Sequence, residues 1–298
     1  MSNHVQRTTC PVCKNQSLRE VLTAKDFTVS NESFVITECT HCSLRFTQGI
    51  PCETAIQRYY QSASYISHSN TKKGLVNRAY HWVRYFTMMS KESLVKKATK
   101  KSVGMLLDVG SGTGTFVHTM VKAGWNVSGL EPDAEARALG VKKYNCDIYP
   151  SEELFRLPEG TYDAITMWHV LEHVHQLDEY IEQLKKLLAP KGKLIIAVPN
   201  YTSKDAAVYK EYWAAYDVPR HLYHFSPASM RKLMEMHGLK VIYTRPMWLD
   251  SFYISMLSEK YKKGNMLRAL RNGLASNFNA LLNKEQSSSL IYIIEKTA

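Results

Sequence analysis

The chain has 298 residues, of which 45% are hydrophobic, and its formal net charge at pH 7 is +11. A chain of this length and composition can bury one substantial core and a small accessory module. The N-terminal residues lack the apolar stretch of a signal peptide, and no run of roughly 18 apolar residues occurs. These observations argue against secretion and membrane spanning, and for a cytoplasmic location.

Four of the six cysteines form two C-x-x-C pairs near the N-terminus, Cys10 with Cys13 and Cys39 with Cys42. Two such pairs can place four thiolates tetrahedrally around one Zn²⁺, whereas disulfides do not fit a chain without an export signal. Between the pairs, residues 18–23 and 33–38 alternate as short strands do. Residues 1–50 are therefore predicted to be a zinc ribbon. Its zinc would be structural, because four cysteines leave no open coordination position.

The excess of positive charge is concentrated in residues 72–101, where nine Lys and Arg accompany one acidic residue. Residues 51–102 are predicted to be a helical linker or cap. Within it, Leu75, Ala79, Trp82, Phe86 and Met89 recur at steps of three and four, which predicts an amphipathic helix over 75–99. The basic side is interpreted as a solvated face; the alternative is a lip that faces substrate.

A larger, ligand-binding domain is expected over residues 103–298, starting with the buried strand Leu106–Val109 and three alternate glycines. Gly110, Gly112 and Gly114 allow unusual backbone dihedrals and a close approach to a ligand, and the following helix directs free N–H groups at it. The pattern Asp108-x-Gly-x-Gly-x-Gly is not the dinucleotide G-x-G-x-x-G. It resembles motif I of class I S-adenosylmethionine (SAM) methyltransferases, close to the type 11, 12 and 23 families.

A second predicted strand also ends in an acidic residue, which supports nucleoside binding. Glu131, followed by Pro132, ends the predicted strand 126–131, and its carboxylate can accept hydrogen bonds from both ribose hydroxyls. The resemblance implies SAM as cofactor and S-adenosylhomocysteine (SAH) as product, and it places the adenine near Ser151. The predicted cofactor-binding residues are Asp108, Gly110, Ser111, Gly112, Gly114, Glu131, Pro132, Ser151, Trp168 and His169.

The rest of the chain alternates strands and helices, which predicts an α/β fold. Strands are expected at 146–149, 162–167 and 193–199, with a helix that Asp178 caps and that Pro190 and Gly192 close. Together with strands at 239–244 and 290–295, this gives a doubly wound, seven-stranded Rossmann-like sheet. Ser226 and Pro227 open a further helix. A helical insertion at about 249–288 is expected to form part of a lid or substrate wall.

The resemblance is strongest from about 105 to 200, and it includes the segment Trp168-His-Val-Leu-Glu-His173. It implies a methyltransferase acting on a small molecule, most often at oxygen, with carbon or nitrogen as alternatives. The catalytic candidates are His169, His173 and His221, because neutral imidazole can accept a proton near pH 7. His224 lies on the same loop as His221. No prediction of oligomeric state follows.

Two alternatives stay open at this point. If residues 168–174 are helical, His169, Glu172 and His173 share one face, and His221 or His224 could complete a second metal site similar to that of small-RNA 2′-O-methyltransferases. We favour the other arrangement, in which Glu172 and His173 hold the loop and His169 is a metal-free base. The other functional class is a nucleic-acid-binding or RNA-modifying protein that uses the ribbon and the basic helix.

Overall fold

The computed structural model describes residues 4–60 and 75–297, and the side chains of residues 75–85 lie outside this description. The described chain forms two compact units. Unit 1 comprises residues 4–60, 171–178 and 197–292, and unit 2 comprises residues 75–170, 179–196 and 293–297. The predicted division at residues 50 and 102 follows motifs in the sequence, and it stays a prediction.

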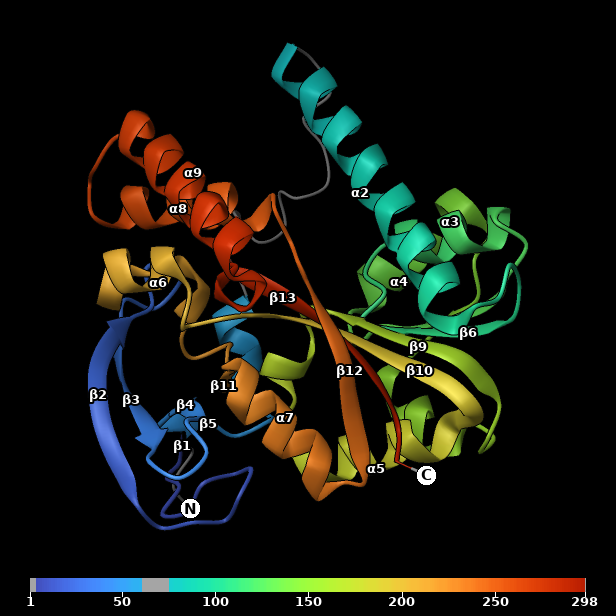
Figure 1. The fold of residues 1–298 in the computed structure, drawn as a ribbon, viewed down its shortest axis with the longest axis horizontal. Helices are drawn as coiled ribbons and strands as arrows, with labels where there is room; N and C mark the ends of the chain where they lie inside the picture. Colours follow the sequence, from blue (N-terminus) through green and yellow to red (C-terminus); the bar gives the residue numbers. More distant parts are fainter. Residues whose placement is uncertain (1–3, 61–74, 298) are drawn as a thin grey trace. The chain divides into compact units, whose positions relative to one another are not determined.

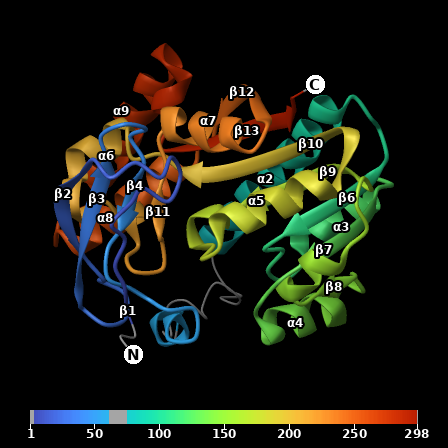
Figure 2. The same cartoon turned by 90° about the horizontal axis from the view of Figure 1, so that it is seen from below.

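The large sheet has seven strands in the order β12-β13-β10-β9-β6-β7-β8 (Figure 1). They are β6 (Met105–Val109), β7 (Asn126–Leu130), β8 (Ile148–Tyr149), β9 (Tyr162–Trp168), β10 (Leu188–Pro199), β12 (Leu239–Pro246) and β13 (Ser289–Lys296). β6 is parallel to β7 on one side and to β9 on the other, and β7 is parallel to β8 (Figure 2). The Rossmann-like fold class is confirmed. Ligands bind such sheets at the carboxyl edge where the strand order reverses, which here is the end of β6.

Unit 2 contains the predicted helices at residues 75–99 and after the glycine-rich turn, and a further helix after β7. They are α2 (Leu75–Thr99), α3 (Thr115–Lys122) and α4 (Ala134–Tyr144), and α5 (Leu177–Leu187) spans the boundary between the units. α3 buries Phe116, Val117 and Met120, but Val121, which the apolar pattern places on the same inward face, is 47% exposed. α4 begins at Asp133, whose carboxylate accepts hydrogen bonds from two backbone amides of the first turn.

Two predicted boundaries around α5 are wrong. α5 begins at Leu177, so Asp178 lies inside its first turn and does not cap it. The helix ends at Leu187 and β10 starts at the next residue, so Pro190 and Gly192 lie in the strand. The reason is that residues 194–198 of β10 are completely buried, and the strand extends backward from this core.

The bounds of α2 agree with the prediction, but not every residue of the predicted apolar stripe is buried. Phe86 and Met89 are exposed, whereas Leu94, Val95 and Ala98 in the last turns are buried. The side chains of Leu75, Ala79 and Trp82 lie outside the described part. The described core contacts of α2 are therefore made by its C-terminal end.

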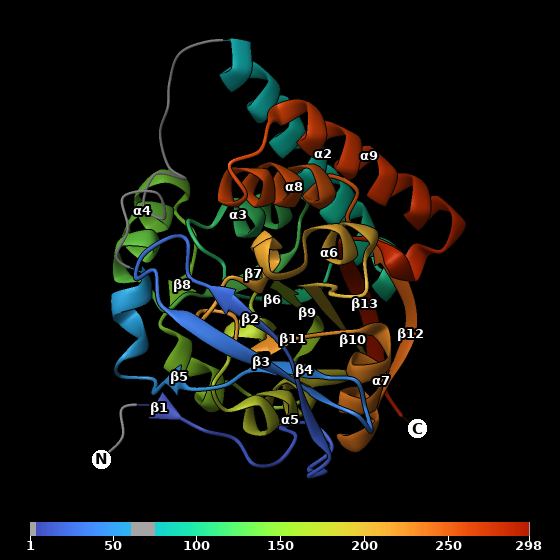
Figure 3. The ribbon, with the colours of Figure 1, turned by 90° about the vertical axis from the view of Figure 1, so that its left-hand side faces the viewer.

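Unit 1 contains a small sheet with the order β11-β4-β3-β2 (Figure 3). Its strands are β2 (Leu18–Lys25), β3 (Ser33–Cys39), β4 (Arg45–Thr47) and β11 (Tyr223–His224), and β1 (His4–Val5) pairs separately with β5 (Ile50–Pro51). Each pair within the small sheet is antiparallel. The two predicted ribbon strands are present. The fourth strand comes from the loop after β10, so the ribbon is joined to a distant part of the chain.

The remaining helices of unit 1 are α6 (Lys204–Tyr209), α7 (Pro227–Met236), α8 (Asp250–Tyr261) and α9 (Met266–Leu282). Ser226 forms a capping box at the start of α7, with Pro227 in the first turn, as predicted. α8 and α9 are the predicted helical insertion between β12 and β13. No helix among the described residues is long and apolar enough to cross a membrane.

Candidate functional site

The glycine-rich turn at the end of β6 has one glycine that opens onto free space. Gly110, Gly112 and Gly114 all have positive φ, of 73°, 54° and 71°. A Cβ on Gly110 would overlap Val170, and one on Gly114 would lie 2.7 Å from Ile148, whereas one on Gly112 would meet nothing within 4 Å. Packing inside the protein therefore explains two of the glycines. Gly112 lacks a side chain where a ligand could approach the backbone.

Glu131 is placed directly beside this turn. One carboxylate oxygen accepts a hydrogen bond from the Gly112 amide at 2.8 Å, and the other accepts one from the Asp133 amide at 3.0 Å. Burial raises the pKa of Glu131, which these two backbone hydrogen bonds oppose. Each oxygen keeps a further lone pair. The carboxylate is thus held at the open glycine, with acceptor capacity for a pair of hydroxyls.

Asp108 lies in the interior under the turn and is 1% exposed. Its carboxyl group accepts a 2.6 Å hydrogen bond from the Thr166 hydroxyl of β9. Burial raises the pKa of Asp108 to about 7, against the hydrogen bond from Thr166 and the positive charge of Lys91. The bond joins β6 to β9 at the switch point. Direct contact of Asp108 with the cofactor stays a prediction.

The other predicted cofactor residues of unit 2 lie around the same edge. Trp168 ends β9, and its ring lies 5.5 Å from Phe116 and 4.1 Å from the Lys91 ammonium group. Its indole N–H and the Ser111 hydroxyl are buried with no hydrogen-bond partner among the described residues. Buried donors normally have partners, so the Trp168 N–H fits a site that a ligand completes. Pro132 is exposed next to Glu131.

Ser151 begins a short 3₁₀ helix, Ser151–Arg156, directly after β8. β8 is the edge strand next to β7 in the sheet, which places Ser151 at the carboxyl edge beyond Glu131. This placement is compatible with the predicted adenine position, which stays a prediction.

His169 follows β9 with a positive φ of 58°, and Val170 after it packs on Gly110. The next helical segment covers only Leu171–His173. Residues 168–174 are therefore not one helix, and the condition for a shared face of His169, Glu172 and His173 is not met. The contact between Val170 and Gly110 instead ties His169 to the glycine-rich turn.

A cluster in unit 1 brings together Glu172, His173 and His221, whose ligand atoms all lie within 4.8 Å of one another. The Nδ1 atom of His173 lies 3.0 Å from the Arg220 carbonyl, and that of His221 lies 2.8 Å from the Ala215 carbonyl. Since carbonyls only accept, the Nδ1 atoms of both rings donate to these carbonyls. The Nε2 atom of His221 lies 4.0 Å from an Asp217 carboxylate oxygen. Burial lowers the pKa of His173 to about 4, so this imidazole is neutral at pH 7.

His224, the remaining histidine of the loop, makes its contacts inside unit 1. Its Nε2 atom lies 3.1 Å from the Thr47 hydroxyl, and its ring packs edge-on against Tyr216. Burial lowers the pKa of His224 well below its usual value. The described cluster of possible ligands therefore includes His221 and not His224.

The four cysteines of the predicted ribbon converge on one point. The sulfurs of Cys10 and Cys42 are 3.5 Å apart, as are those of Cys13 and Cys39, and all four lie within 4.8 Å of one another. A tetrahedral site with Zn–S bonds of about 2.3 Å has sulfurs about 3.8 Å apart. The geometry fits a zinc module. All six cysteines of the chain are free thiols, and Cys52 and Cys146 lie outside this cluster.

Sequence reasoning missed the buried arginine at the centre of unit 1. Arg220 is 1% exposed, and its guanidinium group donates to Asp26, Asp217 and Thr28. Burial would raise the pKa of Asp26, but Arg220 lowers it to about 2. The i, i+3 spacing of Asp217 and Arg220 was the available signal, although the partner Asp26 is 194 residues away.

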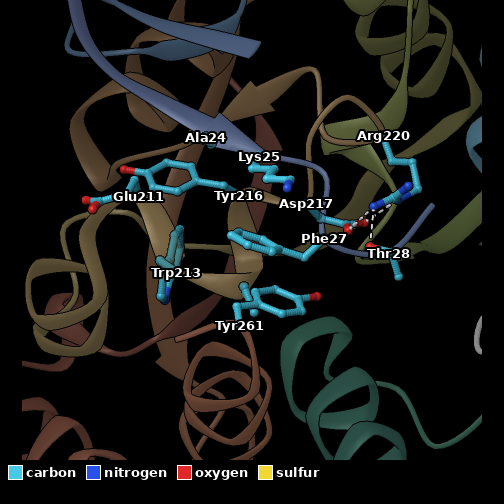
Figure 4. Close-up of a pocket in the computed structure, with 11 residues that line it drawn as sticks. Ala24, Lys25, Phe27, Thr28, Glu211, Trp213, Tyr216, Asp217, Arg220 and Tyr261 are labelled. Carbon is cyan, nitrogen blue, oxygen red and sulfur yellow. Dashed lines mark hydrogen bonds and ion pairs between the residues drawn. The ribbon is translucent and has the colours of Figure 1, made fainter. Parts of the chain in front are cut away.

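A small cavity of about 10 Å³ lies beside this arginine, and its lining includes the aromatic residues Phe27, Trp213, Tyr216 and Tyr261 (Figure 4). Phe27 and Tyr261 stack there at 4.6 Å. Ligand pockets are usually about 300–1,000 Å³, so this one is small for a methyl acceptor.

The basic stretch gives limited support for nucleic-acid binding. Among its described side chains, Lys96 pairs with Glu92, Lys101 pairs with Asp163, and Lys91 lies over the Trp168 ring. These three cations already contact the protein, while Lys97 and Lys100 are exposed. The remaining basic residues up to Arg84 lie outside the described side chains.

The fold and the glycine-rich turn define a nucleoside-binding α/β protein, and comparison with known proteins gives the family. A family model described as a methyltransferase domain matches residues 81–244. The chain therefore belongs to the class I SAM-dependent methyltransferases.

Curated relatives agree with the family assignment. An uncharacterized methyltransferase of Anoxybacillus flavithermus is 27% identical over 53% of this chain and 81% of its own length. A ubiquinone biosynthesis O-methyltransferase of Caulobacter sp. is 30% identical over 35% of this chain and 44% of its own length. The chain thus matches less than half of the Caulobacter enzyme. A demethylmenaquinone methyltransferase of Tropheryma whipplei is 25% identical over 54% of this chain and 72% of its own length.

Solved structures show the same fold. Magnesium protoporphyrin IX methyltransferase from Synechocystis, solved with bound SAH, superposes with a TM-score of 0.55 over 82% of this chain and 100% of its own, at 15% identity. At this identity the likeness concerns the fold alone.

Proposed function

We propose that this chain transfers the methyl group of SAM to a small-molecule acceptor, at an oxygen atom. The observation that carries the proposal is that the Glu131 carboxylate is hydrogen-bonded beside Gly112, where a side chain would meet only open space. The names of curated relatives add support for the acceptor class, since they concern ubiquinone and menaquinone biosynthesis. Among these, the ubiquinone enzyme is named as an O-methyltransferase.

When bound, SAM supplies a methyl group already activated by its sulfonium charge, so the protein has to orient the acceptor and remove a proton. Glu131 would accept the ribose hydroxyls, and the bare backbone of Gly112 would lie against the nucleoside. The Trp168 N–H, buried without a hydrogen-bond partner among the described residues, would donate to the cofactor. His169, held next to the turn through Val170, would take the proton of the acceptor hydroxyl.

Replacing Glu131 with Ala is expected to lower SAM affinity at least about tenfold. Hydrogen bonds to a charged acceptor contribute about 1.5–3 kcal/mol each, and about 1.4 kcal/mol corresponds to a factor of ten. Titration calorimetry measures the effect, and Glu135→Ala, an exposed acid on the next helix, is the matched control. Equal affinity of Glu131→Ala and wild type would place the ribose elsewhere and remove the main support for the proposal.

His169→Asn is expected to reduce turnover at saturating SAM at least about a hundredfold, because general-base catalysis contributes about 10²–10⁴. Asn tolerates the positive φ of this position, so the variant tests the base without straining the backbone. The assay follows SAH release with a catechol that carries a short alkyl chain, and His41→Ala, an exposed histidine, is the control. Full activity of His169→Asn would contradict the role of the base.

A metal-assisted mechanism is the second candidate, and the cluster of Glu172, His173 and His221 supports it. Two imidazoles and a carboxylate are a donor set that holds catalytic zinc and similar ions. We favour the metal-free base because His169 adjoins Val170, which packs on the glycine-rich turn at Gly110. If a strong chelator abolishes activity and only added Mg²⁺ or Mn²⁺ restores it, the metal-assisted mechanism is correct.

We also propose that Zn²⁺ occupies the four-cysteine site and is structural. The proposal rests on the short distances between the sulfurs and on a donor set without an open position. The hydrogen bond between Cys10 and Cys42 lowers the pKa of the Cys10 thiol and raises the pKa of the Cys42 thiol, so the two sulfurs share one proton between them.

A further inference from the structure

Helix α9 of unit 1 has its small residues inside and its large apolar residues outside. The buried positions are Ala269, Gly273, Ser276 and Ala280. A Cβ on Gly273 would lie 2.7 Å from the Phe252 ring of α8, so the two helices pack closely along this face (Figure 3). An amphipathic helix normally turns its large apolar side chains to the core. In α9 the small residues pack against α8, and the large apolar side chains take no part in this contact.

The outer face of α9 is a continuous apolar stripe. Its exposed members are Leu267 (79%), Leu270 (52%), Leu274 (54%), Phe278 (65%) and Leu281 (67%). Their spacing of three, four, four and three residues places them on one side of the helix. Single exposed apolar residues need no explanation, but a contiguous row of large ones indicates an interaction surface.

The exposed charges next to the stripe are all positive. Arg268 and Arg271 lie on α9, Lys260 lies in the last turn of α8, and Lys262 and Lys263 lie between the two helices. All five are exposed. Two neighbouring acids already have partners: Glu259 is buried and bonded to the Tyr209 hydroxyl, and Glu285, three residues past α9, pairs with Arg231. α9 itself contains no Asp or Glu. The face therefore combines leucines with cations, which is the composition of helices that lie in the headgroup region of anionic membranes.

A second copy of the chain fits this face less well. The leucine spacing would allow two copies of α9 to pair, but helix pairs of this kind are usually flanked by opposite charges. A second α9 would offer Arg268, Arg271 and asparagines, and no carboxylate. Charge complementarity therefore favours an anionic lipid surface.

We propose that the α9 stripe docks on the surface of an anionic lipid bilayer, with Leu267, Leu270, Leu274, Phe278 and Leu281 inserted among the headgroups and Arg268 and Arg271 against lipid phosphates. Docking of this kind does not depend on the proposed methyl transfer. It would hold unit 1 at a membrane surface whatever the acceptor is.

The test is co-flotation of the full chain with vesicles, either pure phosphatidylcholine or with about a third phosphatidylglycerol. Wild type is expected to float with the anionic vesicles, and more weakly as salt is raised. Leu270→Gln/Leu274→Gln is expected to partition at least about tenfold less, because Gln keeps helix propensity and removes the apolar contact. Arg268→Gln/Arg271→Gln is expected to lose the preference for anionic vesicles.

The matched control is Leu139→Gln/Val141→Gln, which removes two similarly exposed apolar side chains from α4 of unit 2 and is expected to float as wild type does. Circular dichroism and SAH binding verify that every variant is folded, and they are read independently of flotation. Absence of wild-type flotation, or equal flotation of the Leu270/Leu274 variant, would overturn the proposal. So would a dimer in sedimentation that this variant dissociates, since the stripe would then be covered by a second copy.

Discussion

Gly112→Val is expected to lose SAM binding by at least about a hundredfold, which corresponds to about 2.8 kcal/mol. A Cβ at this position would have no neighbour within 4 Å, and the added side chain would fill the space through which the cofactor has to approach. A β-branched residue at φ 54° also strains the backbone by about 1–3 kcal/mol, so loss of binding alone would not separate the two causes.

Gly160 provides the matched control in the same unit. It has φ 65°, and a Cβ there would also meet nothing within 4 Å, but it lies in the loop before β9. Gly160→Val should therefore suffer the same backbone strain and a similar loss of melting temperature while it binds SAM normally. If the Gly112 and Gly160 variants lose affinity equally, strain explains the effect, and the open glycine is not the nucleoside site.

Cys39→Ser is expected to release the metal and to destabilise unit 1 strongly, because structural zinc contributes about 10–16 kcal/mol in small zinc domains. Cys39 ends β3, which pairs with β4, and β4 pairs with β11 from the far side of the sequence. The damage should thus spread beyond the first 50 residues. SAM binding should persist, since the glycine-rich turn and Glu131 belong to unit 2.

Elemental analysis and thermal melting measure this prediction. We expect one zinc per chain in wild type and in Cys52→Ser, whose cysteine lies outside the cluster, and almost none in Cys39→Ser. Wild-type protein purified without any zinc would contradict the structural role.

The glycine-rich turn, Glu131 and the two cysteine pairs could be found from the sequence because each has a fixed local spacing. The doubly wound, seven-stranded sheet followed from the alternation of apolar strands and amphipathic helices. Boundaries failed where helix-ending residues lay within a strand, as in the early start of β10 at Leu188, since that strand runs through Pro190 and Gly192 before it reaches the core.

Features that depend on distant partners were not predictable. Arg220 meets Asp26 across 194 residues, and β11 joins the ribbon sheet from the loop after β10. The hypothesis of one helix over 168–174 used spacing alone, but the positive φ of His169 ends any helical run there. The inverted amphipathicity of α9 was also hidden, because the sequence shows apolar periodicity without saying which face α8 covers.

The central claim is that the nucleoside of SAM binds at Gly112 and Glu131, and a crystal structure of the chain with SAH tests it most directly. We expect both ribose hydroxyls within about 3 Å of the Glu131 carboxylate, as hydrogen bonds require. We also expect the nucleoside in contact with the backbone of Gly112. A ribose bound elsewhere, with the Glu131 oxygens bonded only to the amides of Gly112 and Asp133, would contradict the claim.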